Sequence, residues 1–205
     1  MTANLLRIRR LVRARLGVPA SDRFFSDDVI DDHINLAIET IDTEYRWPWF
    51  DAVATMSVLA GSRSFALPPD WRVTRAVFYN NAELAGVAPA DLARRTPSEG
   101  VPEVWAQIAS TIAIDPYPSS DIEVGLLYYS RSRQMENDRD ELTMPAQFVG
   151  AVVAKAAELL CVREDDSAQA ESHRAEYSSW LGRMRREVRR TTAPVSVRVR
   201  DGSWV

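Results

Sequence analysis

The sequence is poor in the residues that usually carry redox and metal chemistry. Its 205 residues include one cysteine, Cys161, so no disulfide can form within the chain and a cysteine-based metal site would lack partner ligands. Only two histidines, His33 and His173, are present, which argues against a zinc centre or a histidine-based catalytic site. Phosphate-binding glycine loops, a nucleophile elbow and a His-Glu-x-x-His motif are also missing. We therefore expect no cofactor, no bound metal and no enzymatic activity.

Long apolar segments are missing as well. No run approaches the roughly 20 residues that span a bilayer, and the N-terminal residues contain neither the apolar core nor the cleavage site of a secretory signal. We expect a cytoplasmic protein without membrane contact. With 46% hydrophobic and 26% charged residues the composition is that of a globular chain, which excludes collagen-like and disordered classes. The length suits one domain, with or without a small inserted module.

The chain carries its charge unevenly. Residues 1–19 contain five arginines and no acid, and residues 182–205 contain seven arginines against Glu187 and Asp201. The residues between them hold 13 basic and 27 acidic side chains, so both ends are basic and the body is acidic although the net charge is only −4. Three interpretations stay open: contact with nucleic acid, contact between copies of the chain that meet head to tail, or ordinary solvated charge on helix surfaces.

Hydrophobic periodicity predicts two helices near the N-terminus. The apolar residues from Leu5 to Leu16 recur at intervals of three and four, and Gly17 ends this helix. Ser26 suits the N-cap of a second helix, whose apolar stripe continues towards Pro48.

The middle of the chain alternates with the period of β-strands. The expected strands are residues 53–59, 63–67, 73–79, 103–108, 111–115 and 122–130, with a helical turn at 89–95. Ala60-Gly61-Ser62 has the composition of a hairpin turn, and Asn80-Asn81 makes the turn after the third strand. The connections are too short for crossover helices, so we expect antiparallel pairing.

Helical periodicity then returns. Pro145 suits the first position of a third helix, and a fourth begins near Ser167 and carries His173 on its apolar face. This order predicts an α+β fold, in which a four-helix bundle carries an inserted antiparallel β module and an extended C-terminal arm. The expected parts are 1–50 and 144–190 for the two halves of the bundle, 51–143 for the β module and 191–205 for the arm.

The aromatic segment 45–50 and the single residue Trp204 each require an apolar surface to pack against. The segment 45–50, Tyr-Arg-Trp-Pro-Trp-Phe, lies where the second helix gives way to strands, and we favour its packing between the helical and β parts over an exposed partner-binding patch. Trp204 follows Arg198, Arg200 and Asp201 and has no local core to enter. It is either frayed or docked on another subunit, and we favour docking.

Several short motifs follow one another in a distinctive order. They are Phe65-Ala66-Leu67-Pro68-Pro69-Asp70-Trp71, Pro102-Glu103-Val104-Trp105-Ala106-Gln107-Ile108, Ile112-Ala113-Ile114-Asp115-Pro116-Tyr117-Pro118 and Leu126-Leu127-Tyr128-Tyr129. A helix pair ending in the aromatic segment precedes them, and a helix pair with a terminal arm follows. This order, over most of residues 4–190, resembles the head-to-tail adaptor (connector) proteins of tailed bacteriophages, including the podovirus tail accessory factor and tail tubular protein A types.

The resemblance implies a structural virion protein at the head-tail interface, assembled in the host cytoplasm. Such proteins form a homo-oligomeric ring, usually a dodecamer, beneath the portal protein. The ring continues the DNA channel without sequence-specific DNA binding and carries the tail nozzle or tail tube protein. The expected contacts with the portal or a neighbouring subunit are Arg198, Arg200, Trp204 and Val205, and further basic interface residues are Arg7, Arg10, Arg13, Arg186 and Arg190.

Two other functions stay as alternatives. A nucleic-acid-binding protein would use the Arg-rich terminal helices and would lose affinity steeply with salt, but the acidic total and the near absence of lysine count against it. A hydrolase would need a carboxylate pair, such as Asp138 with Asp140, in a cleft, and the sequence locates none.

Overall fold

The computed structural model describes residues 3–192. This part of the chain forms two compact units: a β unit, Ile38–Glu136, and a helical unit made by the residues up to Ala37 and those from Asn137 onward. Both boundaries lie earlier in the chain than the module boundaries 50/51 and 143/144 expected from the sequence.

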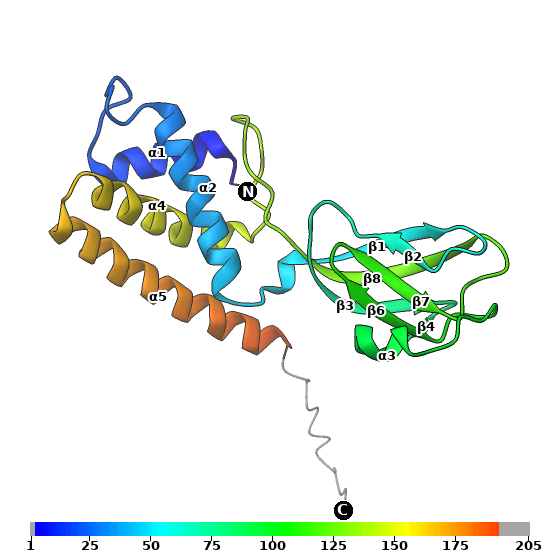
Figure 1. The fold of residues 1–205 in the computed structure, drawn as a ribbon. Helices are drawn as coiled ribbons and strands as arrows, with labels where there is room; N and C mark the ends of the chain where they lie inside the picture. Colours follow the sequence, from blue (N-terminus) through cyan, green and yellow to red (C-terminus); the bar gives the residue numbers. More distant parts are fainter. Residues whose placement is uncertain (1–2, 193–205) are drawn as a thin grey trace, which may run out of the picture. The chain divides into compact units, whose positions relative to one another are not determined.

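The helical unit is built on long helices. They are α1 (Leu5–Leu16), α2 (Asp27–Glu44, in this unit as far as Ala37), α4 (Val149–Arg163) and α5 (Ser167–Thr192). Helix α4 lies between α1 and α5 (Figure 1). Main-chain hydrogen bonds attach the N-terminus to the segment before α4, because the Leu5 amide donates to the Asp140 carbonyl at 3.0 Å and the Leu142 amide to the Ala3 carbonyl at 2.9 Å.

The first helix begins and ends where the sequence predicts, and the second begins at the predicted N-cap but ends at Glu44, before Pro48. The Asn4 side chain caps α1 by accepting from the Arg7 amide at 3.1 Å, and Gly17 ends it in the left-handed region at φ 69°. Ser26 Oγ accepts from the Val29 amide at 3.4 Å at the start of α2. Both N-caps satisfy amides that have no partner within the first turn of a helix.

Small residues let the helices approach α4 closely. The buried residues of this helix include Ala151, Ala154, Ala156 and Ala157. At Gly150 a Cβ atom would lie 2.3 Å from the Trp180 ring of α5. Glycine is therefore what allows the indole of Trp180 to lie against the backbone of α4.

The last two helices differ from the sequence prediction at their ends. A short 3₁₀ turn, η2 (Ala146–Phe148), follows Pro145, so Pro145 does not occupy the first position of α4. Helix α5 continues to Thr192, so residues 191–192, expected in the extended arm, are helical. Arg189 and Arg190 in the last turn favour this extension because cations stabilise the C-terminal end of the helix dipole.

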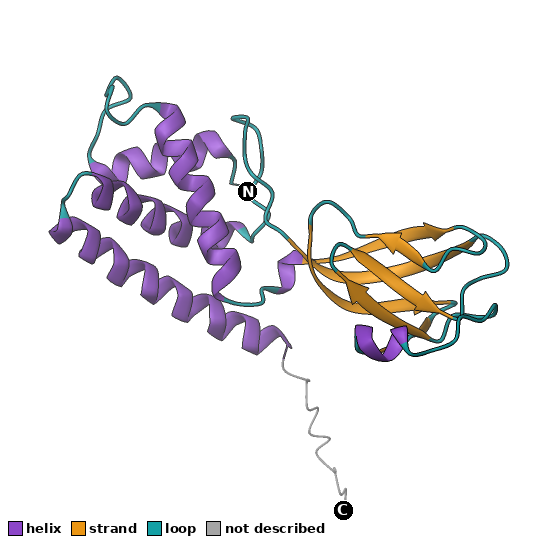
Figure 2. Cartoon of the chain, viewed as in Figure 1, coloured by secondary structure: helices purple, strands orange, loops and turns teal. Residues whose placement is uncertain are grey.

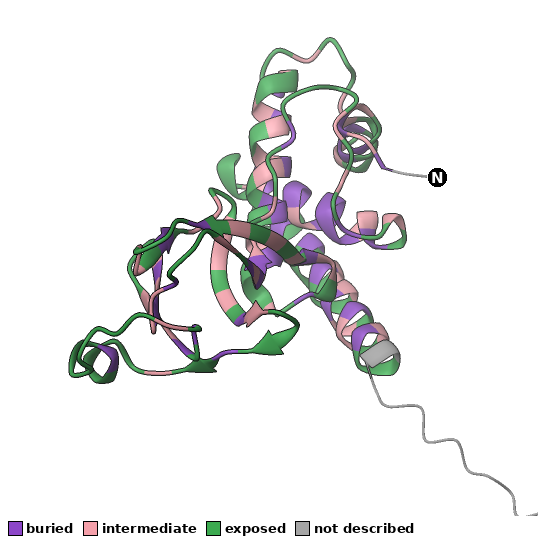
Figure 3. Ribbon diagram, turned by 90° about the vertical axis from the view of Figure 1, so that its right-hand side faces the viewer, coloured by how far each residue is buried: buried purple, intermediate pink, exposed green. Residues whose placement is uncertain are grey.

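The β unit contains two four-stranded sheets (Figure 2). One has the order β1 (Asp51–Val58), β8 (Ile122–Ser130), β3 (Trp71–Tyr79) and β4 (Ala82–Glu83); the other has β2 (Ser64–Ala66), β7 (Thr111–Asp115), β6 (Val104–Ile108) and β5 (Ala85–Gly86). Their inner faces share a core that consists of Val58, Phe65, Val77, Leu84, Ile112, Ile114, Val124, Leu126 and Tyr128. Exposure alternates along β1 as the period of two requires (Figure 3). A short helix, α3 (Pro89–Ala93), precedes β6.

The predicted hairpin at residues 60–62 is wrong. Strand β1 pairs with β8 and β2 with β7, so this turn carries the chain from one sheet to the other. The turn is held from outside, because the Gly61 amide donates to the Pro118 carbonyl at 2.8 Å and the Ala60 amide to the Asp121 carboxylate at 2.8 Å. The separation also places Val58 and Phe65 in the core between the two sheets.

The expectation of purely antiparallel pairing needs one correction. Strands β5 and β6 are parallel, with Ala85 opposite Val104, and α3 lies in the connection between them. A short helical crossover therefore fits within a connection that the sequence suggested was too short. The turn predicted at Asn80-Asn81 is confirmed, with both residues at positive φ between the antiparallel β3 and β4.

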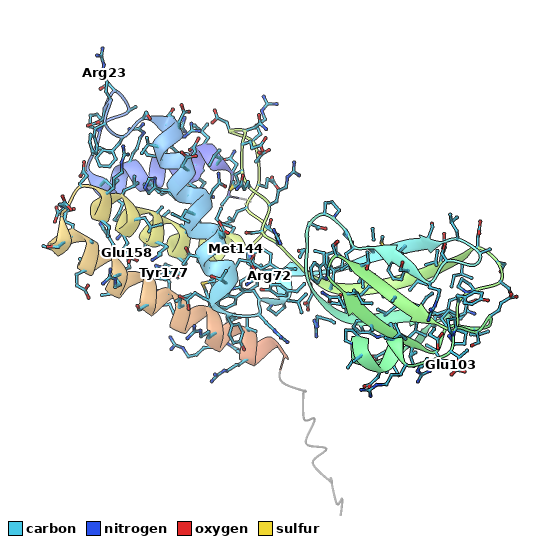
Figure 4. All side chains as sticks on the ribbon, viewed as in Figure 1. Arg23, Arg72, Glu103, Met144, Glu158 and Tyr177 are labelled. Atoms are coloured by element: carbon cyan, nitrogen blue, oxygen red, sulfur yellow. The ribbon has the colours of Figure 1, made fainter. Side chains whose placement is uncertain are left out.

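Trp47 and Phe50 of the aromatic segment are buried, and the hydrogen bonds of Trp47 lie within the β unit. Trp47 and Phe50 are 0% and 1% exposed, and Phe50 ends a 3₁₀ turn, η1 (Pro48–Phe50). The Trp47 indole donates to the Ile41 carbonyl at 2.6 Å, and the Trp47 amide donates to the Tyr129 hydroxyl at 2.8 Å. Burial raises the pKa of Tyr129 to about 12. Arg72, labelled in Figure 4, makes an ion pair with Asp42 at 2.8 Å, and its guanidinium lies over the Tyr129 ring.

The α+β class is confirmed. Helices α1, α4 and α5 pack side by side in that order, and ion pairs described below connect α2 to α1. That the four long helices form one bundle stays a prediction.

Candidate functional site

The predicted basic interface residues fall into two groups. Arg7 and Arg10 on α1 and Arg186 and Arg190 on α5 are exposed. Arg13 is 7% exposed, and its guanidinium donates to the Pro19 and Phe25 carbonyls at 2.8 and 2.7 Å. We leave Arg13 out of the assembly surfaces because its hydrogen bonds are used within the chain. The predicted contacts Arg198, Arg200, Trp204 and Val205 lie outside the described residues.

Arginines on one side of α1 bind the start of α2. Arg13 pairs with Asp27 at 2.7 Å. Arg9 pairs with Asp31 and also reaches Asp138 at 3.0 Å, in the segment before α4. The hydrogen bond that the Arg9 guanidinium donates to the Asp31 carboxylate is the main cause that raises the pKa of Arg9. These charges hold the helical unit together and are not free to bind a partner.

The opposite side of α1 forms one wall of an open groove. The groove has a volume of about 560 Å³ and is lined by Arg7, Leu11, Ala14, Arg15, Gln147, Val149, Gly150, Val153 and Trp180, which come from α1, α4 and α5 and the turn before α4. Leu11 is 38% exposed, although it is an aliphatic residue on a helix with a well-defined buried face. An apolar residue exposed inside a concave surface is typical of a binding site.

Charged side chains border this groove. Arg7 is exposed, and Arg15 makes an ion pair with Glu176 of α5. The Arg183 guanidinium lies over the Trp180 ring, 5.0 Å from its centroid. The groove thus has an apolar floor and mostly basic edges, which suits an apolar partner segment with acidic flanks.

A second exposed surface follows α2. Its outward residues Asp28, Asp32, Leu36 and Glu39 recur at intervals of four, four and three, so they form one stripe. Leu36 is 46% exposed in the middle of these acids. The stripe lies away from the buried residues Ile30, Ile34, Ile38 and Ile41 of the same helix.

The second half of α5 is strongly basic. Arg183, Arg186, Arg189 and Arg190 are exposed on it. Its buried face carries Leu181, Met184 and Val188. These arginines are the observation that favours a contact with acidic protein surfaces or with nucleic acid.

The β unit has a smaller cavity of about 260 Å³ near α3. Arg63, Leu92 and Ile108 are among its lining residues. Close by, Asp115 is 3% exposed and lies 3.6 Å from Arg63 and 3.7 Å from Arg95. Its Oδ1 makes no hydrogen bond within the described part of the chain. The arrangement is an ion cluster of one carboxylate and two arginines beside a cavity that Ser64 and Thr111 also line.

The residues with possible redox or metal chemistry are dispersed. His33 Nδ1 lies 2.7 Å from the Val29 carbonyl of its own helix. His173 is 8% exposed, and burial lowers its pKa. Cys161 is buried, which raises the pKa of its thiol. Among residues 3–192, no group of three or more His, Cys, Asp and Glu could hold a metal ion.

Comparison with known proteins decides the family. A protein-family model described as SU10 adaptor protein matches residues 3–200. The chain belongs to the SU10 adaptor protein family. This adaptor is therefore a bacteriophage structural protein of the head-to-tail class and a component of the virion, as the resemblance implied. No curated protein matches the adaptor in sequence. Over the described range, none of the adaptor's helices has the length and apolarity needed to cross a membrane.

Sequence reasoning missed the groove and the stripe on α2. The signals for both are present, since Leu11 and Leu36 lie off the buried face of otherwise amphipathic helices. A single exposed leucine is common on protein surfaces, so only the shape around Leu11 and the acids around Leu36 make these residues informative.

Proposed function

We propose that this adaptor forms a homo-oligomeric ring, a dodecamer, that docks on the portal protein, continues the DNA channel and provides the platform for the tail. The observation that carries the proposal is the match of the SU10 adaptor model to nearly the whole chain, residues 3–200. The exposed arginines of α1 and α5 and the acidic stripe of α2 supply oppositely charged surfaces for contacts between copies.

The arm contributes a second kind of contact in this proposal. Residues 193–205 contain Val195, Val197, Val199 and Trp204 among Arg198 and Arg200. A segment of this length rarely builds a core of its own. We expect it to bind the portal protein or a neighbouring subunit, with Trp204 as the apolar anchor.

The test uses the full-length protein, a variant lacking residues 194–205 and the cognate portal protein. Electron micrographs of the wild-type mixture should show a ring on the portal. The shortened variant should keep the wild-type circular dichroism spectrum and thermal midpoint but bind the portal at least about tenfold more weakly. A control with residues 194–205 in scrambled order separates the effect of sequence from that of length. Wild-type portal binding by the shortened variant would contradict the role of the arm.

Nucleic-acid binding is the second candidate, favoured by the exposed arginines of α5. It predicts affinity for duplex DNA that falls steeply with salt and is lost when Arg183, Arg186, Arg189 and Arg190 become glutamine. The adaptor proposal expects weak DNA binding, because the acidic body repels phosphate. Fluorescence anisotropy with a labelled duplex at two salt concentrations distinguishes the two functions.

A further inference from the structure

Basic and apolar side chains alternate along the α1 wall of the groove in the helical unit. Arg7, Leu11 and Arg15 are spaced four residues apart, so they lie in one line on the same side of the helix. At a rise of about 1.5 Å per residue this line is about 12 Å long. The groove therefore presents a basic, apolar, basic pattern, with the Trp180 ring and Val153 of the other helices beside the central leucine. Arg15 keeps its ion pair with Glu176 of the same copy, and its side chain is still 40% exposed, so a further acid can approach it.

Helix α2 presents the opposite pattern on a convex surface. Asp32, Leu36 and Glu39 follow one another at intervals of four and three, and Asp28 continues the acidic end. The line from Asp32 to Glu39 is about 11 Å long at the same helical rise. Its length and order match the line in the groove, with an exposed leucine at the centre of each.

We propose that the stripe of α2, residues Asp28, Asp32, Leu36 and Glu39, lies in the α1, α4 and α5 groove of a second copy of this chain. Leu36 contacts Leu11 and the Trp180 ring, and the acids of the stripe lie near Arg7 and Arg15. An amphipathic helix in an apolar groove is a recurring mode of protein recognition. Apolar contact at the centre supplies most of the affinity, and the charges at the ends set the register.

Contact of this kind is directional. Arg9 and Arg13 join α1 to Asp27 and Asp31 of α2 within one copy, and the groove and the stripe lie on other sides of these two helices. Each copy can therefore donate its stripe to one neighbour and accept a stripe from another. Such a heterologous contact closes into a ring when the rotation between copies fits. The inference rests on the proposed function, because it specifies how the ring subunits meet.

Cysteine cross-linking tests the contact directly, even if the isolated copies associate weakly. Leu11→Cys and Leu36→Cys are made in separate full-length chains, mixed and treated with a short bis-maleimide. Both positions are exposed, whereas the natural Cys161 is 3% exposed and reacts slowly. We expect the mixed pair to form covalent dimers about tenfold faster than either variant alone. A Val53→Cys chain, whose side chain is 76% exposed on β1, replaces either partner as the control.

The result that overturns the inference is equally clear. If the Leu11→Cys and Leu36→Cys chains cross-link no faster than either does with the Val53→Cys control, the groove and the stripe do not meet. Faster cross-linking of one variant with itself also overturns it, because that result requires an isologous contact. A third overturning result is an equal rate for the mixed pair after Arg7→Glu and Arg15→Glu are added to the Leu11→Cys chain.

Ring formation on the portal separates this inference from the proposed function. We expect Leu36→Asp to reduce ring formation at least about tenfold while Val162→Asp, at a 51% exposed control site, leaves it unchanged. If wild-type protein forms rings and Leu36→Asp does so equally, the inference fails and the adaptor function stands. If wild-type protein forms no ring on its portal, the proposed function fails, and the cross-linking rates still decide whether the groove binds the stripe.

Discussion

The charges Arg13 and Glu158 buried in the helical unit are closely paired, whereas the β unit buries one closely paired carboxylate, Asp42, which lies 2.8 Å from Arg72, and one loosely paired carboxylate, Asp115. In the helical unit Arg13 and Glu158 are both less than 10% exposed, and each has partners at hydrogen-bond distance: 2.7 to 2.8 Å for Arg13 and 3.0 Å for Glu158. In the β unit Asp115 is equally buried, but its two arginines lie 3.6 and 3.7 Å away.

Arginines of one helix can have two uses, because some pair within the chain and stabilise the fold while others stay exposed to other molecules. Buried charges that are fully paired fix the geometry of the helices, since removing one partner leaves the other without compensation. Arg9 and Arg13 are used in this way on one side of α1, and Arg7 and Arg10 remain exposed on other sides. An Arg-rich helix thus holds its own unit together and still presents a charged surface to other molecules.

The largest effect is expected in the apolar core of the β unit. Leu126 is fully buried on β8, which pairs with β1 on one side and β3 on the other. Leu126→Ala should lower the free energy of unfolding by about 3 kcal/mol, because it removes buried methyl groups and leaves a cavity. Hydrogen exchange measured by mass spectrometry should show the loss in residues 38–136 and unchanged protection in α4 and α5. The exposed control Val53→Ala should change stability by less than about 0.5 kcal/mol. Equal loss of protection in both units would show that the comparison between them is mistaken.

A buried arginine should give the next largest effect, in the other unit. Arg13→Met keeps the aliphatic stem but removes hydrogen bonds to the Pro19 and Phe25 carbonyls and the ion pair with Asp27. We expect a loss of about 2 kcal/mol, since buried acceptors are left without donors. Urea denaturation followed by circular dichroism at the helical band measures it. Arg10→Met, an exposed change on the same helix, is the control and should fall within about 0.5 kcal/mol of wild type.

Local pattern was enough to predict most helices and strands, and it failed where distant partners decide. Gly17 and Ser26 mark helix ends through hydrogen bonds within a few residues, so their roles are visible in the sequence. The turn at Gly61 is different, because its partners Pro118 and Asp121 come from far along the chain. A turn sequence predicts that the chain bends but does not specify which strands pair afterwards.

The candidate site was predicted only in its electrostatic part. The excess of arginine at the chain ends led to the prediction that Arg7, Arg10, Arg186 and Arg190 are interface residues; these four are exposed, and their role in an interface stays a prediction. It could not distinguish Arg13, because the carbonyls that Arg13 binds become available only when the loop after α1 folds back. The groove was also not predictable, since one of its walls is α1, which is distant in sequence from α4 and α5.

A direct comparison of two buried carboxylates, Glu158 and Asp115, should give a smaller difference. Glu158 accepts from Lys155 and Arg174 at 3.0 Å each, whereas Asp115 has only longer contacts with its arginines (Figure 4 labels Glu158). Glu158→Gln should therefore cost about 1 kcal/mol more than Asp115→Asn, after allowance for the solvent that screens half-exposed Arg174. Paired thermal and urea measurements on both variants test the order. If Asp115→Asn lowered the free energy of unfolding more than Glu158→Gln, the cluster of Asp115 with Arg63 and Arg95 would contribute more to stability than the closer contacts of Glu158.

The smallest expected effect depends on pH and concerns His173 in the helical unit. Burial lowers its pKa below the ordinary value of 6.5, with Arg15 as a further cause, so the folded chain binds this proton less readily than the unfolded chain. Stability is then independent of this group above pH 6.5 and decreases as the pH falls below 6.5, until the folded histidine is itself protonated. One group can change the free energy of unfolding by at most about 1.4 kcal/mol per pH unit. His173→Gln should flatten the profile between about pH 6.5 and 5, a range that lies above most carboxylate pKa values. His33→Gln, which removes the other histidine, is the matched control, and chemical denaturation at each pH is the measurement. A profile for His173→Gln as steep as that of wild type would show that other groups cause the acid sensitivity of this unit.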